Sequence, residues 1–95
     1  MLKPKTLGLW ANTDKDIFWN ILPEIIEWAK RKNIQIFATE KIQSDSRFNF
    51  TDILQIGIQN KISEMDFLLV LGGDGTFLSC ARSVKDQDTP ILGIH

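Results

Sequence analysis

The chain has 95 residues, 43% of them hydrophobic, and its 11 Lys and Arg against 12 Asp and Glu give a net charge of −1 at pH 7. This length suits one small domain, and the balanced charge argues against a protein that binds nucleic acid by electrostatic attraction. Residues 1–16 lack the apolar run of a signal peptide, and no segment is apolar enough to span a bilayer. With one cysteine, Cys80, which is expected in the core, the chain predicts a soluble, cytoplasmic protein.

The first half of the chain predicts a strand followed by a helix. Residues 6–11 form a short apolar run typical of a strand, and in the polar turn that follows Asn12, Thr13 or Asp14 could cap a helix. Apolar residues then recur every four positions, as in a helix that lies on a sheet. They are Ile17, Ile21, Ile25 and Ala29, flanked by Phe18, Leu22 and Ile26.

Two residues interrupt or end this helical pattern. Pro23 removes a backbone donor, so it predicts either a kink or the start of the main helical body. Asn33 is a suitable C-terminal cap. Residues 34–39 then have the apolar composition of a second strand, whereas the polar residues 40–50 are expected to form a loop.

The second half of the chain predicts the same alternation. Residues 51–62 fit a short helix capped by Thr51, although their isoleucine spacing leaves a strand open. We expect a strand over 67–71, a helix from about 76 to 84 and a last strand over 90–94. This alternation indicates an α/β fold with a mostly parallel, Rossmann-like sheet and flanking helices. Ligands of such sheets bind beyond the carboxyl ends of the strands.

The sequence FLLVLGGDGTFLSCAR, residues 67–82, places a glycine turn between a strand and a helix. It is not a Walker A loop, because no Gly-Lys-Ser/Thr follows, and it is not the fingerprint G-x-G-x-x-G, because Leu78 replaces the third glycine. The turn still suits an anion. Gly72, Gly73 and Gly75 permit a sharp bend with exposed amides, and the following helix N-terminus attracts negative charge.

Asp74 is the unexpected member of this turn, because a carboxylate beside phosphates is unfavourable unless it faces another group. It could hold a magnesium ion through water, or accept the proton of a sugar hydroxyl that attacks a phosphoryl group. Thr76 could cap the helix or donate its hydroxyl to a phosphate oxygen. The simpler alternative is that Asp74 only caps the helix and the glycines only turn the chain.

The segment DFLLVLGGDGTFLSCARSVKDQDTPILGIH, residues 66–95, resembles the N-terminal domain of NAD kinases. Its motif GGDGT is shared with diacylglycerol and sphingosine kinases and, as a close variant, with phosphofructokinases. The ending TPILGIH favours NAD kinases, because lipid kinases usually have a proline-glycine-threonine-asparagine pattern there. The resemblance implies phosphoryl transfer from ATP or polyphosphate to the 2′-hydroxyl of the NAD adenosine ribose, with Mg²⁺ as the expected divalent metal.

The resemblance also implies roles for residues of this chain. Asp74 matches the family's proposed general base, and Gly75 lies in the segment that contacts the dinucleotide. Gly72, Gly73 and Thr76 belong to the loop associated with phosphate binding. No residue is assigned as a metal ligand.

The chain also departs from the family pattern. Ser79 stands where some members have a basic residue, and His95 stands where asparagine is common. The family's second, β-rich domain, with its Asn-Glu or Asn-Asp pair and most NAD contacts, does not occur in residues 1–95. We therefore expect this chain to be the N-terminal α/β domain of a two-domain kinase, apparently truncated and inactive alone.

The full-length protein is expected to bind NAD and ATP, to have no nucleic-acid or membrane partner, and to form a homo-oligomer. Two alternatives stay open. One is a lipid kinase of the same superfamily, and the other is a non-catalytic nucleotide-binding module that kept the loop and lost the chemistry.

Overall fold

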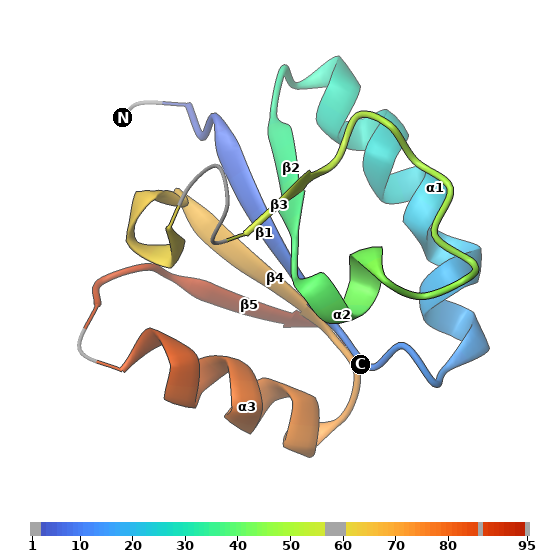
Figure 1. The fold of residues 1–95 in the computed structure, drawn as a ribbon. Coiled ribbons are helices and arrows are strands. Elements are labelled where there is room, and N and C mark those ends of the chain that lie inside the picture. The colour runs from blue at the N-terminus through green and yellow to red at the C-terminus, as the bar shows by residue number, and fades with distance from the viewer. Residues whose placement is uncertain (1–2, 57–60, 86, 95) are drawn as a thin grey trace.

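The computed structural model describes residues 3–56, 61–85 and 87–94, within which five strands form one parallel sheet (Figure 1). The strands lie in the order β3-β2-β1-β4-β5 and are β1 (Thr6–Ala11), β2 (Gln35–Ala38), β3 (Leu54–Gln55), β4 (Phe67–Leu71) and β5 (Ile91–Ile94). The helices are α1 (Asp16–Arg31), α2 (Glu40–Gln43), α3 (Asp74–Val84) and the 3₁₀-helix η1 (Ile62–Glu64). The predicted α/β fold is confirmed.

The sheet has a hydrophobic core on each face, because the side chains of β4 alternate between the two faces. Leu69 and Leu71 belong to the core that contains α1, whereas Leu68 and Val70 belong to the core that contains Cys80 of α3. The two helices therefore cover opposite faces of the sheet (Figure 1). Right-handed crossovers explain this, since the chain moves from β1 to β2 in one direction and from β4 to β5 in the other.

α1 confirms the predicted helix and its buried apolar stripe, except at the first residue of the stripe. Phe18 and Leu22 are buried, whereas Ile17, the first residue of the predicted stripe, is 72% exposed. Residues four apart differ by about 400° around a helix, so a stripe with that spacing drifts by about 40° at each step. The buried face consequently starts at Phe18 and includes Ile25 and Ala29, but not Ile17.

The start of α1 differs from the prediction. The helix begins at Asp16, and among the described residues no side chain makes a cap hydrogen bond to it. Asn12 Oδ1 instead accepts a hydrogen bond from the Asp14 amide at 3.1 Å, and Thr13 is buried. The prediction that Asn12, Thr13 or Asp14 caps this helix is wrong, because these residues form the turn that leaves β1.

The rest of α1 is one continuous helix that ends in a Schellman motif. It runs through Pro23, so a separate first turn before the proline is excluded. Its C-cap is Lys32, and the predicted cap Asn33 follows with a left-handed φ of 58°. The Ile34 amide donates to the Ala29 carbonyl at 2.8 Å, which closes the helix end. Asparagine tolerates this left-handed conformation better than most residues.

Two predictions for the middle of the chain are wrong. Residues 40–50 are not all loop, because they begin with α2, which the fully buried Ile42 anchors to the core. Residues 51–62 do not form the predicted helix; their described part contains β3, which pairs with β2 and fits the alternative of a strand. Residues 57–60 lie outside the described part. No helix among the described residues is long and apolar enough to cross a bilayer.

Candidate functional site

The strand order places the topological switch point of the sheet between β1 and β4. These strands end side by side: Ala11 pairs with Leu71, and the Asn12 amide donates to the Leu71 carbonyl at 3.0 Å. Ligands of open α/β sheets bind in the crevice beyond the strand ends at this point. The predicted glycine turn follows β4 directly, so the fold brings it to the crevice.

Gly72 is required by the local backbone. Its φ is +150°, which a residue with a β-carbon rarely adopts. A Cβ at this position would lie 2.7 Å from Thr76 Oγ1 and 3.3 Å from Asn12 Cβ. The loop is therefore folded back so closely on the first turn of α3 that only glycine fits.

Gly73 and Gly75 serve a different purpose, because a Cβ at either position would meet no described atom within 4 Å. Their backbone borders space that a ligand can enter. α3 begins at Asp74, slightly before the predicted start, and the Phe77 amide donates to the Gly73 carbonyl at 3.2 Å. The amides of Asp74, Gly75 and Thr76 precede that bond and have no acceptor within the helix, so they are placed to bind an anion.

A polar cleft of about 550 Å³ lies beside these amides. Its lining comes from β1, α2, α3 and the segments after β1 and β2, and consists of Trp10, Ala11, Asn12, Asp14, Thr39, Lys41, Gly75, Thr76 and Ser79. Gly75 and Thr76 are the predicted site residues that reach it. Thr39 and Lys41 were not predicted, although both closely follow the carboxyl end of β2, where ligands of such sheets bind.

The other predicted residues lie at or near a second, apolar hollow. Gly72 and Gly73 line a space of about 410 Å³ together with residues of α1 and with Ile94. Asp74 lines neither cavity and is exposed in the first turn of α3, between Gly73 of the apolar hollow and Gly75 of the polar cleft. The glycine loop thus borders both cavities, and the Asp74 carboxylate lies on the residue between the two parts of the loop.

The turn after β1 is fixed by Arg47. Its Nη2 donates to the Thr13 carbonyl at 2.6 Å, and its Nε donates to Asp45 Oδ1 at 3.0 Å. The hydrogen bond from the Arg47 side chain holds the pKa of Asp45 below its ordinary value. The guanidinium also stacks over Trp19, whose Nε1 donates to the same Thr13 carbonyl at 2.9 Å. These contacts hold in place the segment that carries Asn12 and Asp14 to the cleft.

Cys80 lies on the buried side of α3 and has no accessible surface. Burial raises the pKa of its thiol to about 11. A thiol with this pKa stays protonated at neutral pH and is a poor nucleophile. The prediction that Cys80 belongs to the core is therefore confirmed.

The described residues do not form a metal site of their own. Among them, no group of three or more His, Cys, Asp and Glu side chains is arranged to hold a metal ion. Magnesium sites of phosphotransferases often use one or two carboxylates together with the substrate phosphates. Asp74 is a single ligand of that kind and does not form a metal site by itself. His95 lies outside the described residues.

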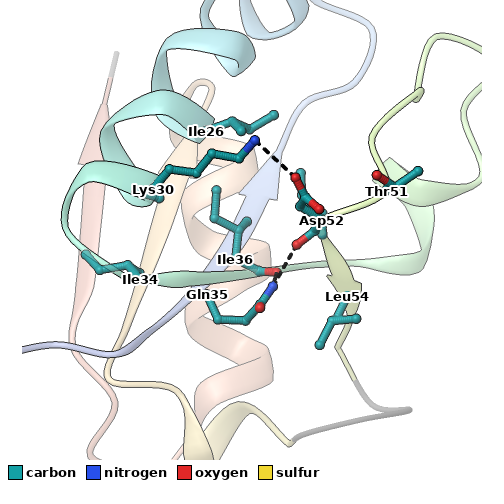
Figure 2. A pocket seen from close by; sticks show the side chains of 10 residues that line it. Ile26, Lys30, Ile34, Gln35, Ile36, Thr51, Asp52 and Leu54 are labelled. Atoms are coloured by element: carbon teal, nitrogen blue, oxygen red, sulfur yellow. Dashed lines mark hydrogen bonds and ion pairs between the residues drawn. The ribbon is translucent and has the colours of Figure 1, made fainter.

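A third hollow, of about 370 Å³, lies near the amino end of β2 (Figure 2). Its polar groups bind one another: Lys30 Nζ lies 3.1 Å from Asp52 Oδ2, and Gln35 Nε2 donates to the Asp52 carbonyl at 2.7 Å. These contacts join α1 to the segment before β3. Because this hollow is far from the carboxyl ends of the strands, we place the candidate functional site at the glycine loop.

The fold and this loop define a Rossmann-like α/β domain with a glycine turn at its switch point. Residues 7–95 match the protein family described as the ATP-NAD kinase N-terminal domain. The chain therefore belongs to the ATP-NAD kinase family.

Curated relatives named NAD kinase align with nearly the whole chain. The protein from Clostridium botulinum (strain ATCC 19397 / Type A) is 38% identical over 92 residues, which cover 96% of this chain and 29% of the relative. The protein from Syntrophotalea carbinolica is 30% identical over 92 residues, covering 96% and 31%. The protein from Hydrogenovibrio crunogenus is 30% identical over 89 residues, covering 94% and 31%. The chain spans about three tenths of the length of these relatives.

Proposed function

We propose that the full-length protein is an NAD kinase, which transfers a phosphoryl group from ATP or polyphosphate to the 2′-hydroxyl of the NAD adenosine ribose. The observation that carries this proposal is the glycine loop, with open space at Gly73 and Gly75, at the switch point of a chain that belongs to the ATP-NAD kinase family. The names of the relatives agree with it. In this proposal residues 1–95 supply the phosphate loop and the general base, and a second domain supplies most NAD contacts.

The loop has the parts that phosphoryl transfer requires, which are positioning and stabilisation of charge. The amides of Gly75 and Thr76 and the positive end of α3 would bind phosphate oxygens. Gly73 and Gly75 leave room for those oxygens to approach the backbone. Gly72 would act indirectly, by allowing the turn that directs these amides to the crevice.

Asp74 would act as the general base. The 2′-hydroxyl oxygen forms a bond to the transferred phosphorus, the bond from that phosphorus to the leaving phosphate oxygen breaks, and the hydroxyl proton passes to the Asp74 carboxylate. With ATP as donor the products are NADP and ADP. Because Asp74 is exposed between the two cavities, a ribose can reach it while the phosphates occupy the side of the amides. Its charge would then face the nucleophile.

A divalent metal, Mg²⁺, belongs to this proposal as a ligand of the donor phosphates, where it neutralises their charge. The described residues do not gather into a metal site, so the donor phosphates would provide most of the ligands of the ion. Asp74 is the loop residue whose carboxylate could contact it through water.

The test is formation of NADP by the full-length protein from NAD, ATP and Mg²⁺, with polyphosphate replacing ATP in a parallel assay. We expect turnover by the full-length protein and none by residues 1–95. Phosphorylation of diacylglycerol or sphingosine instead would identify a lipid kinase. Binding of NAD or ATP in a titration without turnover would identify a nucleotide-binding module. Either result, without NADP, contradicts the proposal.

A further inference from the structure

Lys41 has a fixed position at the polar cleft. It is the second residue of α2 and follows the end of β2 closely. Its neighbours anchor the helix, because Ile42 is fully buried and Gln43 Nε2 donates to the Ile53 carbonyl at 3.2 Å. The backbone of Lys41 is therefore held at the cleft while its side chain is exposed.

The Lys41 ammonium is available to a ligand, in contrast to two other basic side chains, those of Lys30 and Arg47. Lys30 pairs with Asp52, and Arg47 pairs with Asp45 and Asp16. Within residues 3–56, 61–85 and 87–94, no ion pair includes Lys41, and it is the one basic residue that lines the cleft. The cleft therefore contains a positive charge that the fold itself does not use.

Groups that bind anions line the same cavity, together with one acidic side chain, the exposed Asp14. Thr39 contributes a hydroxyl from the end of β2, and Thr76 and Ser79 contribute hydroxyls from α3. The amide of Gly75 belongs to the N-terminal turn of α3, where the helix dipole is positive. Lys41 reaches the cleft from α2, so the cavity has donors on two separate elements. Donors on two separate elements can each contact one phosphate of a linked pair, and a charged donor such as Lys41 makes the stronger hydrogen bond.

We propose that Lys41 binds the pyrophosphate group of a nucleotide substrate, next to the phosphate that the α3 amides hold. The inference rests on the proposed function and deepens it, because it assigns a binding role to a residue outside the glycine motif. ATP and NAD both contain a pyrophosphate, so the proposal specifies only this shared group. The kinetic assay below tells whether the group that Lys41 binds belongs to ATP or to NAD.

The test uses the full-length protein with the substitutions Lys41→Ala and Lys41→Arg. Loss of one charged hydrogen bond should raise the KM of one nucleotide about 10- to 100-fold. The value of kcat should change by less than about threefold, since in this proposal Lys41 binds the substrate and does not contact the reacting atoms. Lys41→Arg should restore most of the affinity, and the raised KM, for ATP or for NAD, identifies the bound substrate. Lys32→Ala, an exposed lysine at the C-cap of α1, is the matched control.

Binding of inorganic tripolyphosphate, measured by titration calorimetry, tests the site independently of the kinase reaction. Lys41→Ala should weaken this binding about tenfold or more, whereas Lys32→Ala should leave it unchanged. The proposal is overturned if both KM values and the tripolyphosphate affinity of Lys41→Ala stay within twofold of wild type, or if the wild-type protein does not bind tripolyphosphate. If the wild type binds it through Lys41 but forms no NADP, the proposed function fails and the anion site stands.

Discussion

The unit β1-α1-β2 and the unit β4-α3-β5 bury their apolar residues to different extents. In the first unit, one face of the 16-residue helix α1 is buried along its length, from Phe18 to Ala29. In the second unit, α3 buries Cys80 and Val84 but leaves Leu78 53% exposed. On β5, Leu92 is 54% exposed and Ile94 is 41% exposed.

This difference in burial suggests separate tasks for the two units: the first contributes more to stability, and the second contains the candidate functional site. The first unit is closed by hydrogen bonds at both ends, including the Schellman motif at Asn33 and the contacts of Arg47 to the turn after β1. It therefore provides a rigid support at the end of β1. The second unit contains the glycine loop, whose backbone must stay accessible if it is to bind a ligand. Substitutions can separate these two contributions.

The largest expected effect is on chemistry in the second unit. Asp74→Asn in the full-length protein removes the proton acceptor but keeps the shape of the side chain. We expect kcat for NADP formation to fall about 10²- to 10⁴-fold, with the unfolding temperature nearly unchanged. Asp88→Asn, at an exposed aspartate outside the crevice, is the control and should retain full activity. Normal turnover by Asp74→Asn would remove Asp74 as the general base.

The next effect is on stability and contrasts the two helices. Leu22 of α1 has no accessible surface, so Leu22→Ala should lower the free energy of unfolding by about 2–5 kcal/mol. Leu78 of α3 is half exposed, so Leu78→Ala should cost less than about 1 kcal/mol. Urea unfolding of residues 1–95, followed by tryptophan fluorescence, measures both values. Equal losses would mean that the two units contribute alike to the core.

The smallest effect separates the glycines of the loop. Gly72→Ala should destabilise the domain by about 1–3 kcal/mol, because alanine is strained at a φ of +150° and contacts Thr76. Gly73→Ala should change stability by less than about 0.5 kcal/mol, since its Cβ meets nothing within 4 Å. In the full-length protein Gly73→Ala should nevertheless weaken nucleotide binding, because the methyl group enters the space for the ligand. If Gly73→Ala destabilises as much as Gly72→Ala, the two glycines do not have separate roles.

The sequence predicted those parts of the fold that depend on local pattern. The apolar runs at β1, β2, β4 and β5 were recognisable, and a parallel sheet placed the residues after β4 at the ligand-binding edge. The motif then indicated Gly72–Thr76, and the structure shows why Gly72 must be glycine. The family match agrees with the resemblance that the same segment carries.

The parts that sequence did not predict depend on tertiary contacts. β3 has two residues and exists because β2 offers it a free edge, so a local pattern of isoleucines could not distinguish it from a helix. The buried face of α1 is set by the sheet beneath it, which excludes Ile17. Lys41 reaches the cleft because the buried Ile42 holds α2 at the end of β2, and no motif marks that position.

In the proposed function, Asp74 faces the attacking hydroxyl while the amides of α3 bind the phosphates. A crystal structure of the full-length protein with NAD and a non-hydrolysable ATP analogue tests it most directly. We expect a distance of about 2.6–3.2 Å between a carboxylate oxygen of Asp74 and the 2′-hydroxyl oxygen of the adenosine ribose. A complex in which Asp74 contacts only backbone amides of α3, with the 2′-hydroxyl bound to another residue, would contradict it.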